Sequence, residues 1–91
     1  MATVVITLRI MPESAENDLS LVQKELEKKI TEFGAEYGKT DVEEVAFGLK
    51  CLKTVFLLDE SRGSTDELEK EIQTIPGVGS VDVIDVRRTI G

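Results

Sequence analysis

Apolar residues alternate with other side chains along the first segment of the chain, Thr3 to Met11. A two-residue period is typical of a β-strand. Pro12 is expected to end this strand, because proline has no amide hydrogen to donate to a neighbouring strand. The apolar face of the predicted strand consists of Val4, Ile6, Leu8 and Ile10.

After Pro12 the apolar positions change to a spacing of three or four residues, which predicts an amphipathic helix. Asp18 is the expected N-cap, because its carboxylate can accept a hydrogen bond from an amide that the first turn leaves unpaired. Gly34 suits the left-handed residue that follows a helix. The predicted buried stripe consists of Leu19, Val22, Leu26, Ile30 and Phe33.

The middle of the chain predicts two strands. The segment 35–40 is polar and contains a glycine, so we expect the next strand to run from Val42 to Phe47 and to be more exposed than the first. Gly48 separates it from the most apolar run, Leu49 to Asp59, which is the expected central strand. Both alternating faces of that run are apolar. A strand covered on both faces and a strand with a bulge both account for this pattern.

The last third of the chain predicts a turn, a short helix and a final strand. Glu60 to Gly63 forms the turn, and Ser64-Thr65-Asp66-Glu67 is the pattern of a capping box. Pro76 and Gly77 end the helix, and the strand runs from Val78 to Ile90. The expected buried stripe of this helix consists of Leu68, Ile72 and Ile75.

The order strand-helix-strand-strand-helix-strand predicts an α+β protein. Each helix has one apolar stripe, so both helices should cover the same face of a sheet. The ferredoxin-like βαββαβ fold satisfies this pattern with a four-stranded antiparallel sheet whose other face stays open. With 91 residues, we expect one domain over residues 1–91.

Composition narrows the classes of function. The formal net charge is −7, which disfavours direct binding to nucleic acid or to an anionic membrane and favours a basic protein partner. The chain has no histidine, one cysteine and no phosphate-binding glycine loop, so we expect no cofactor, no metal site and no bond-making enzyme chemistry. The first apolar segment is interrupted by Arg9 and is too short to cross a bilayer, so a cytoplasmic location is expected.

Several residues admit two interpretations. Cys51 is either a small core residue or a reactive thiol. The acidic cluster Asp41, Glu43 and Glu44 is either a solvated edge or a cation site, and Asp59-Glu60 has the pattern of an ordinary polar turn. Phe47 is either a core residue or an interface anchor. The pair Arg87-Arg88 is either a solvated strand end or a positive finger presented to a partner.

Three segments resemble the exchange domain of the elongation factor 1-beta family, in its archaeal form. Val45 to Leu52, which reads Val-Ala-Phe-Gly-Leu-Lys-Cys-Leu, resembles the family signature aliphatic-[Ala/Gly]-[Phe/Tyr]-Gly-[Ile/Leu]-Lys-Lys-Leu. Ser64 to Leu68 resembles the start of the family's second helix, and Val78 to Val83 its last strand. Met11-Pro12-Glu13 is similar to the archaeal branch. The resemblance covers essentially the whole chain.

This resemblance implies the ferredoxin-like fold and a partner, the GTPase elongation factor 1-alpha, from which the family promotes release of GDP. It implies partner contacts at Phe47, Gly48 and Lys50. A lysine near the C-terminus of eukaryotic members, which reaches toward the magnesium and phosphate site, falls on Arg88, with Arg87 as a rival. The chain departs from the eukaryotic pattern by this arginine, by its longer end, and by Tyr37-Gly38 in place of a Trp-Gly pair.

Three alternatives remain. A ferredoxin-like module can be a regulatory domain that binds a small molecule. An RNA-recognition module shares the topology but needs aromatic residues on its central strands and a basic sheet. A third alternative is a non-catalytic subunit of a larger assembly. For the exchange factor, we expect a monomer when the chain is free of its partner.

Overall fold

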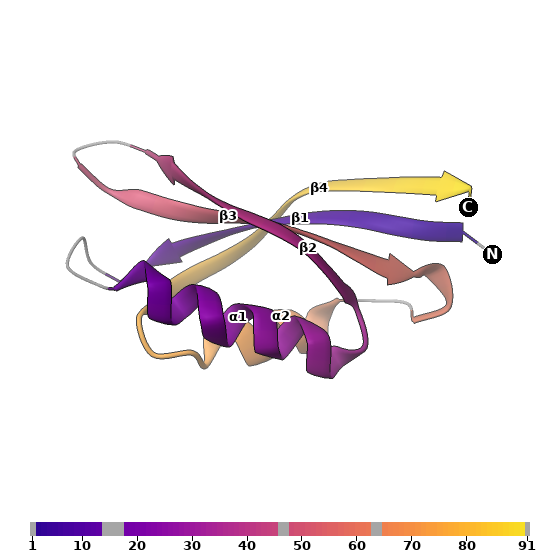
Figure 1. Cartoon of the computed structure of the whole chain (residues 1–91), viewed down its shortest axis with the longest axis horizontal. Coiled ribbons are helices and arrows are strands. Elements are labelled where there is room, and N and C mark those ends of the chain that lie inside the picture. The colour runs from indigo at the N-terminus through magenta and orange to yellow at the C-terminus, as the bar shows by residue number, and fades with distance from the viewer. Residues whose placement is uncertain (1, 14–17, 46–47, 63–64, 91) are drawn as a thin grey trace.

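The computed structural model describes residues 2–13, 18–45, 48–62 and 65–90. These residues form strands and helices in the predicted order β-α-β-β-α-β (Figure 1). The strands are β1 (Ala2–Pro12), β2 (Glu36–Glu44), β3 (Lys50–Asp59) and β4 (Val78–Ile90). The helices are α1 (Leu19–Phe33) and α2 (Asp66–Gln73), and a 3-10 turn, η1 (Glu60–Arg62), follows β3.

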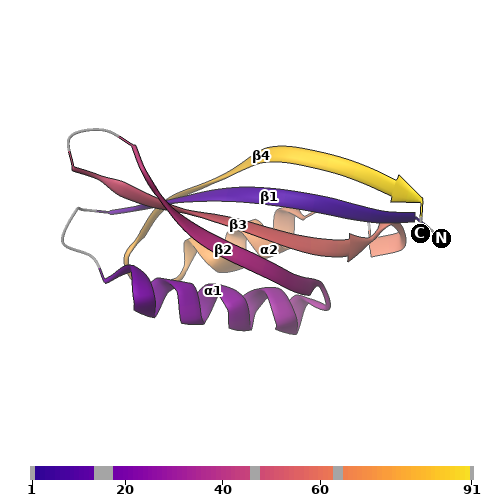
Figure 2. The ribbon, with the colours of Figure 1, turned by 45° about the horizontal axis from the view of Figure 1, so that its top comes forward.

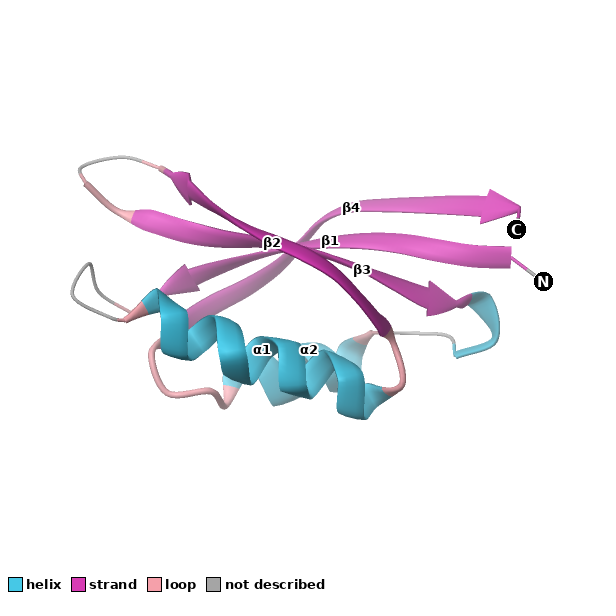
Figure 3. Cartoon of the chain, in the orientation of Figure 1, coloured by secondary structure: helices cyan, strands magenta, loops and turns pink. Residues whose placement is uncertain are grey.

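The four strands form one antiparallel sheet in the order β2-β3-β1-β4. Both helices lie beneath the same face of this sheet, as the cartoon coloured by secondary structure and the turned view show (Figure 3 and Figure 2). The opposite face carries no second layer of described residues. This arrangement confirms the ferredoxin-like α+β fold that the sequence predicted. No helix in the described part of the chain has the length and apolar character needed to span a membrane.

The core lies between the sheet and the two helices. The predicted N-cap is confirmed, because the carboxylate of Asp18 accepts a hydrogen bond from the amide of Ser20 at 2.9 Å. Gly34 ends α1 in the left-handed region with φ 98°. The buried apolar side chains include Ile6, Leu8 and Ile10 of β1, Val22, Leu26 and Ile30 of α1, Leu52, Phe56 and Leu58 of β3, and Leu68 and Ile72 of α2.

The structure resolves the two-sided apolar pattern of the central strand. Leu52 and Phe56 point toward the helices and are fully buried. Val55 and Leu57 point to the open face and are half-buried. The pairing of β3 with β1 continues without a register shift, so β3 has no bulge toward β1. Because β3 lies between β2 and β1, side chains of these two strands flank Val55 and Leu57 and partly shield them on the open face.

The second strand begins earlier than the sequence predicted. The expected start was Val42, but β2 already pairs with β3 at Glu36 and ends at Glu44. The register shifts between Tyr37 and Lys39, so Gly38 is an extra residue that interrupts the two-residue alternation. A Cβ atom at this glycine would lie 2.6 Å from the carbonyl oxygen of Val55. Because this bulge interrupts the alternation, the first half of β2 could not be recognised as a strand from the sequence pattern.

The start of the second helix also differs from the prediction. Ser64 lies outside the described residues, so the capping box is not described. The N-cap of α2 is Thr65, whose side chain makes no capping hydrogen bond. Instead, its hydroxyl donates to the carboxylate of Glu69 at 3.1 Å. Leu68, Ile72 and Ile75 are all buried, as predicted, although Ile75 lies beyond the end of α2 at Gln73.

Candidate functional site

The two C-terminal arginines project from opposite faces of the sheet. In β4, Arg87 pairs with Val5 and Arg88 with Val4 of β1. Consecutive side chains of a strand point to opposite sides. Because Val4 packs against the core, Arg88 projects from the helix-bearing face and Arg87 from the open face. A partner docked on one face of this strand therefore contacts only one of the two arginines directly.

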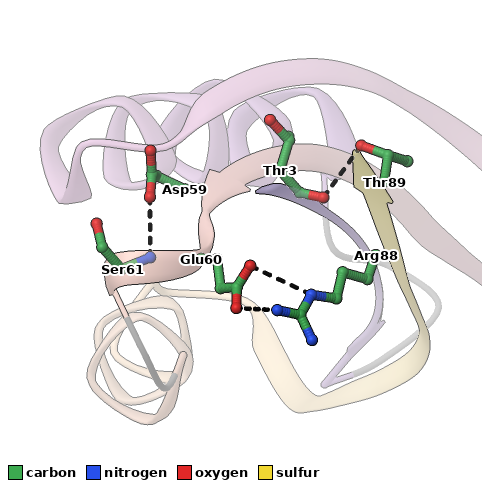
Figure 4. A network of polar contacts seen from close by, with 6 residues as sticks. All are labelled: Thr3, Asp59, Glu60, Ser61, Arg88 and Thr89. Atoms are coloured by element: carbon green, nitrogen blue, oxygen red, sulfur yellow. Dashed lines mark hydrogen bonds and ion pairs between the residues drawn. The ribbon is translucent and has the colours of Figure 1, made fainter. Parts of the chain in front are cut away.

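Arg88 makes a two-point contact with Glu60 (Figure 4). Its Nε donates to Oε2 of Glu60 at 3.2 Å, and its Nη2 donates to Oε1. Both side chains remain accessible, with 68% of the arginine and 42% of the glutamate exposed. No local pattern in the sequence indicates this pair, because the two residues lie 28 positions apart in the chain.

Short contacts fix the backbone on both sides of this ion pair. The carboxylate of Asp59 accepts a hydrogen bond from the amide of Ser61 at 2.8 Å, and this bond lowers the pKa of Asp59 from its ordinary value. The hydroxyl of Thr89 donates to the carbonyl of Thr3 at 3.1 Å. Asp59 and Glu60, which have the pattern of an ordinary polar turn, each make a specific contact in the fold.

The segment that resembles the family signature joins β2 to β3. Phe47 lies outside the described residues. The amide of Val45 donates to the carbonyl of Leu49 at 2.9 Å, which closes the connection. Gly48 is exposed and has φ 77°, a conformation that favours glycine. Lys50, the first residue of β3, is also exposed, so this end of the hairpin is open to a partner.

The hairpin end and the arginine end lie at opposite ends of the sheet (Figure 1). Lys50 pairs with Glu44 beside the connection, whereas Leu58 and Arg88 both pair with Val4. The eight steps along the strand from Lys50 to Leu58 span about 26 Å at about 3.3 Å per step. The structure therefore brings Gly48 and Lys50 together, and Arg87 and Arg88 together, but separates the two pairs.

A row of charged residues crosses the open face of the sheet. Asp41 pairs with Lys53, Lys53 with Arg9, and Arg9 with Asp82, one residue from each strand. Two cations thus lie between two carboxylates. The sequence did not identify this row, because it depends on the register between strands that are distant along the chain. The two positive and two negative charges of this row therefore balance.

Among the described residues, the open face carries none of the aromatic side chains that an RNA-recognition sheet uses. Phe47 aside, the aromatic residues of the chain are Phe33, Tyr37 and Phe56. Phe33 belongs to α1, and Tyr37 pairs with Phe56 on the helix-bearing face. Bases bound on a sheet stack on aromatic side chains of its open face, and none of the described aromatic residues lies there.

Tyr37 and Gly38 contribute to the packing of β2 against β3. The hydroxyl of Tyr37 lies 2.5 Å from Oγ1 of Thr40. The same Oγ1 lies 3.0 Å from Oγ1 of the fully buried Thr54. This chain of hydroxyl groups satisfies a buried polar group.

Cys51 lies on the open side of β3, yet only 1% of the residue is exposed. Burial raises the pKa of its thiol, and the negative charge of Glu43 adds to this shift. A thiol with a raised pKa forms little of the reactive thiolate. The structure thus favours the reading of Cys51 as a packed residue.

A shallow hollow between the two helices is the candidate site for a small ligand. It has a volume of about 260 Å³ and is lined by Lys29, Glu32, Phe33, Glu67, Leu68 and Glu71. An ion pair of 3.2 Å between Lys29 and Glu71 joins the two helices. A second hollow, of about 310 Å³, is lined by Glu67, Lys70, Glu71 and Thr74. Small-molecule sites are mostly apolar with a few polar groups, whereas charged side chains predominate in both hollows, so these two hollows give the regulatory alternative no support.

Comparison with known proteins gives a consistent result. Residues 5–89 match the family described as the EF-1 guanine nucleotide exchange domain. The elongation factor 1-beta of Methanothermobacter thermautotrophicus is 40% identical over 88 residues, which cover 97% of this chain and 98% of that protein. The elongation factor 1-beta of Thermofilum pendens is 36% identical over 92 residues and covers 100% of both.

Among solved structures, the ACT domain from the GTP pyrophosphokinase of Chlorobium tepidum has a similar fold. The TM-score is 0.60, and the match covers 88% of this chain and 96% of that domain. The two sequences are 12% identical, so this likeness concerns the fold alone.

Proposed function

The chain belongs to the elongation factor 1-beta family, and we propose that it acts on its GTPase with the two opposite ends of its sheet. As a member, it promotes the exchange of GDP for GTP on elongation factor 1-alpha and so regenerates the GTP form that delivers aminoacyl-tRNA. One observation carries the proposal for the site: exposed candidate residues lie at both ends of the sheet, about 26 Å apart.

The physical basis of exchange is thermodynamic linkage. A protein that binds the nucleotide-free GTPase tightly must weaken GDP binding by the same factor. Accelerating GDP release a thousandfold requires a barrier about 4 kcal/mol lower. A few well-placed contacts can supply this amount, and bond-making chemistry is not needed. We therefore assign the chain no enzyme activity of its own.

The hairpin end is the proposed anchor. Phe47 supplies the aromatic side chain, since aromatic residues contribute strongly to protein interfaces. Gly48 has φ 77°, a backbone conformation that favours glycine. Lys50 adds a cation at the start of β3, where its side chain is exposed. Docking of this end provides affinity for the GTPase.

The arginine end is the proposed perturbing element. A cation brought near the magnesium site of the GTPase repels the magnesium ion that links GDP to that protein, and so weakens the binding of this ion. Arg87 and Arg88 project from opposite faces, so only one of them faces that site in a given docking. We assign the role to Arg88, because this residue falls on the corresponding lysine of the eukaryotic members and projects from the helix-bearing face.

The remaining properties follow from charge and size. The net charge of −7 repels nucleic acid and favours encounter with a basic protein surface, so the proposed partner is the GTPase alone. We propose a monomer when the chain is free. The proposed location is the cytoplasm, where the GTPase serves translation.

Release of a fluorescent GDP analogue from elongation factor 1-alpha tests these proposals. The purified chain at micromolar concentration should accelerate release, and Phe47→Ala and Arg88→Ala should each reduce the acceleration. Arg87→Ala is the matched control, since it removes an equal charge from the other face of the same strand. No acceleration by the unmodified chain would refute the function. A larger loss with Arg87→Ala than with Arg88→Ala would refute the assignment of the cation.

A further inference from the structure

We propose that Glu60 is a positioning residue for Arg88, which it holds by one edge of the guanidinium group while leaving the other edge for oxygen atoms of the GTPase. This inference rests on the proposed role of Arg88. The chemistry it names is a cluster of acceptor oxygens, such as those that surround a bound magnesium ion and the phosphates of GDP.

The geometry of the contact fixes the orientation of the guanidinium. Glu60 accepts from both Nε and Nη2 of Arg88, with the first contact at 3.2 Å. Two parallel contacts define the plane of the group, which a single contact does not. Nη1 therefore points away from the carboxylate (Figure 4). An arginine offers five N–H donors in a rigid fork, so the outward edge keeps donors for a second acceptor.

Both partners stand on a well-defined backbone. Glu60 begins the 3-10 turn directly after β3, and the bond from Ser61 to Asp59 stabilises that turn. Arg88 is paired with β1, and the next residue, Thr89, bonds to the carbonyl of Thr3. The ion pair thus joins the end of β3 to the end of β4 across β1. A side chain that is already oriented by an ion pair loses less conformational entropy when it binds a partner.

Arg87 provides an internal comparison. Its contact is with Asp85, two residues away on the same strand, through Nε at 3.0 Å. The contact is local to β4 and does not tie the arginine to another strand. Of the two arginines, Arg88 is therefore the one that is oriented by a residue distant in the sequence.

The carboxylate of Glu60 also changes how Arg88 can act on the GTPase. A carboxylate beside Arg88 cancels much of the long-range positive field, so repulsion of the magnesium ion by net charge is weakened. Directed hydrogen bonds from the outward edge remain effective. Arg88 then acts by competing for the oxygen atoms that the magnesium ion or GDP uses. A lysine at this position lacks the fork and cannot be held in the same way.

A double-mutant cycle in the GDP-release assay tests the proposal. The variants are Glu60→Ala, Arg88→Ala and the double variant, each compared with the unmodified chain. We expect Glu60→Ala to reduce the stimulated release by about fivefold, the upper range for an exposed ion pair. In the Arg88→Ala background the same substitution should have no further effect, because nothing remains to be positioned. A purely structural role of Glu60 would slow release equally in both backgrounds.

Asp85→Ala serves as the matched control, since it removes the carboxylate partner of the other arginine. It should leave the stimulated release unchanged, and thermal unfolding should show that all variants are folded. A slower release with Asp85→Ala but not with Glu60→Ala would overturn the inference.

The other outcomes separate the inference from the function on which it rests. If the unmodified chain fails to accelerate release, the proposed function itself is wrong. If Arg88→Ala is as active as the unmodified chain, the role of Arg88 and the positioning by Glu60 are both refuted, while the exchange activity stands. If Arg88→Ala is impaired but Glu60→Ala is equally active or faster, Glu60 does not position the arginine.

Discussion

Replacing Phe47 and Arg88 with alanine, singly and together, tests whether the two ends of the sheet act on the GTPase independently. The structure separates the hairpin end from the arginine end by eight steps along β3, from Lys50 to Leu58. This spacing corresponds to about 26 Å. The longest dimension of the molecule is 42 Å, so the two ends can contact different regions of a partner.

The expected magnitude follows from this separation. Substitutions more than about 10 Å apart with no shared contact usually have additive free energies within about 0.5 kcal/mol. If each single substitution reduces the stimulated rate by about tenfold, which is about 1.4 kcal/mol, the double variant should be about a hundredfold slower. The uncertainty of 0.5 kcal/mol allows a deviation of about twofold from this product.

The assay is release of the fluorescent GDP analogue under single-turnover conditions, with the factor in excess over the GTPase. A double variant no slower than the worse single variant would refute the reasoning. That result would mean that both side chains contribute to one shared step. The pair Glu60 and Arg88 gives the contrasting expectation, because these side chains touch and should be strongly non-additive.

Three further predictions concern stability and the thiol. Leu26→Ala should lower the free energy of unfolding by about 3 kcal/mol, because Leu26 is fully buried. Leu21→Ala on the same helix should change it by less than about 0.5 kcal/mol, because Leu21 is 60% exposed. Urea denaturation followed by circular dichroism measures both free energies. Gly38→Ala should lower the melting temperature through a loss of about 1–3 kcal/mol, since its Cβ would meet the carbonyl oxygen of Val55 at 2.6 Å; an unchanged melting temperature would show that the bulge has room. Cys51 should be alkylated at pH 8 far more slowly in the folded chain than in urea, because burial raises the pKa of its thiol. The same raised pKa stabilises the fold below the pKa of the unfolded thiol, and this stabilisation is lost as the pH rises through the folded value.

Local signals in the sequence determined most of the fold. The stripe of Val22, Leu26 and Ile30 predicted α1 and its buried face, since helical spacing brings these residues to one side. Asp18 and Gly34 marked the two ends of the helix, because capping depends on residues next to each other in the chain. The alternation in β1 predicted a strand with one apolar face, and the apolar run of β3 predicted a central strand. These features follow from periodicity and local hydrogen bonding, which a sequence displays directly.

Other features required the register of the sheet. The bulge at Gly38 broke the alternation of β2, so the strand appeared to start at Val42 although pairing begins at Glu36. The charge row of the open face depends on which residues of four strands stand side by side. Sequence spacing does not contain this information, because it is fixed by packing of the whole sheet.

For the candidate site, the sequence by itself determined the family signature around Phe47 and the presence of two adjacent arginines at the end of the chain. Only the tertiary structure decided that Arg87 and Arg88 project from opposite faces, that Glu60 holds Arg88, and that the arginines lie far from the hairpin. The physical reason is that side-chain direction and long-range pairing arise from strand register. Register is set by the burial of one face of the sheet against the helices, a property of the folded chain as a whole.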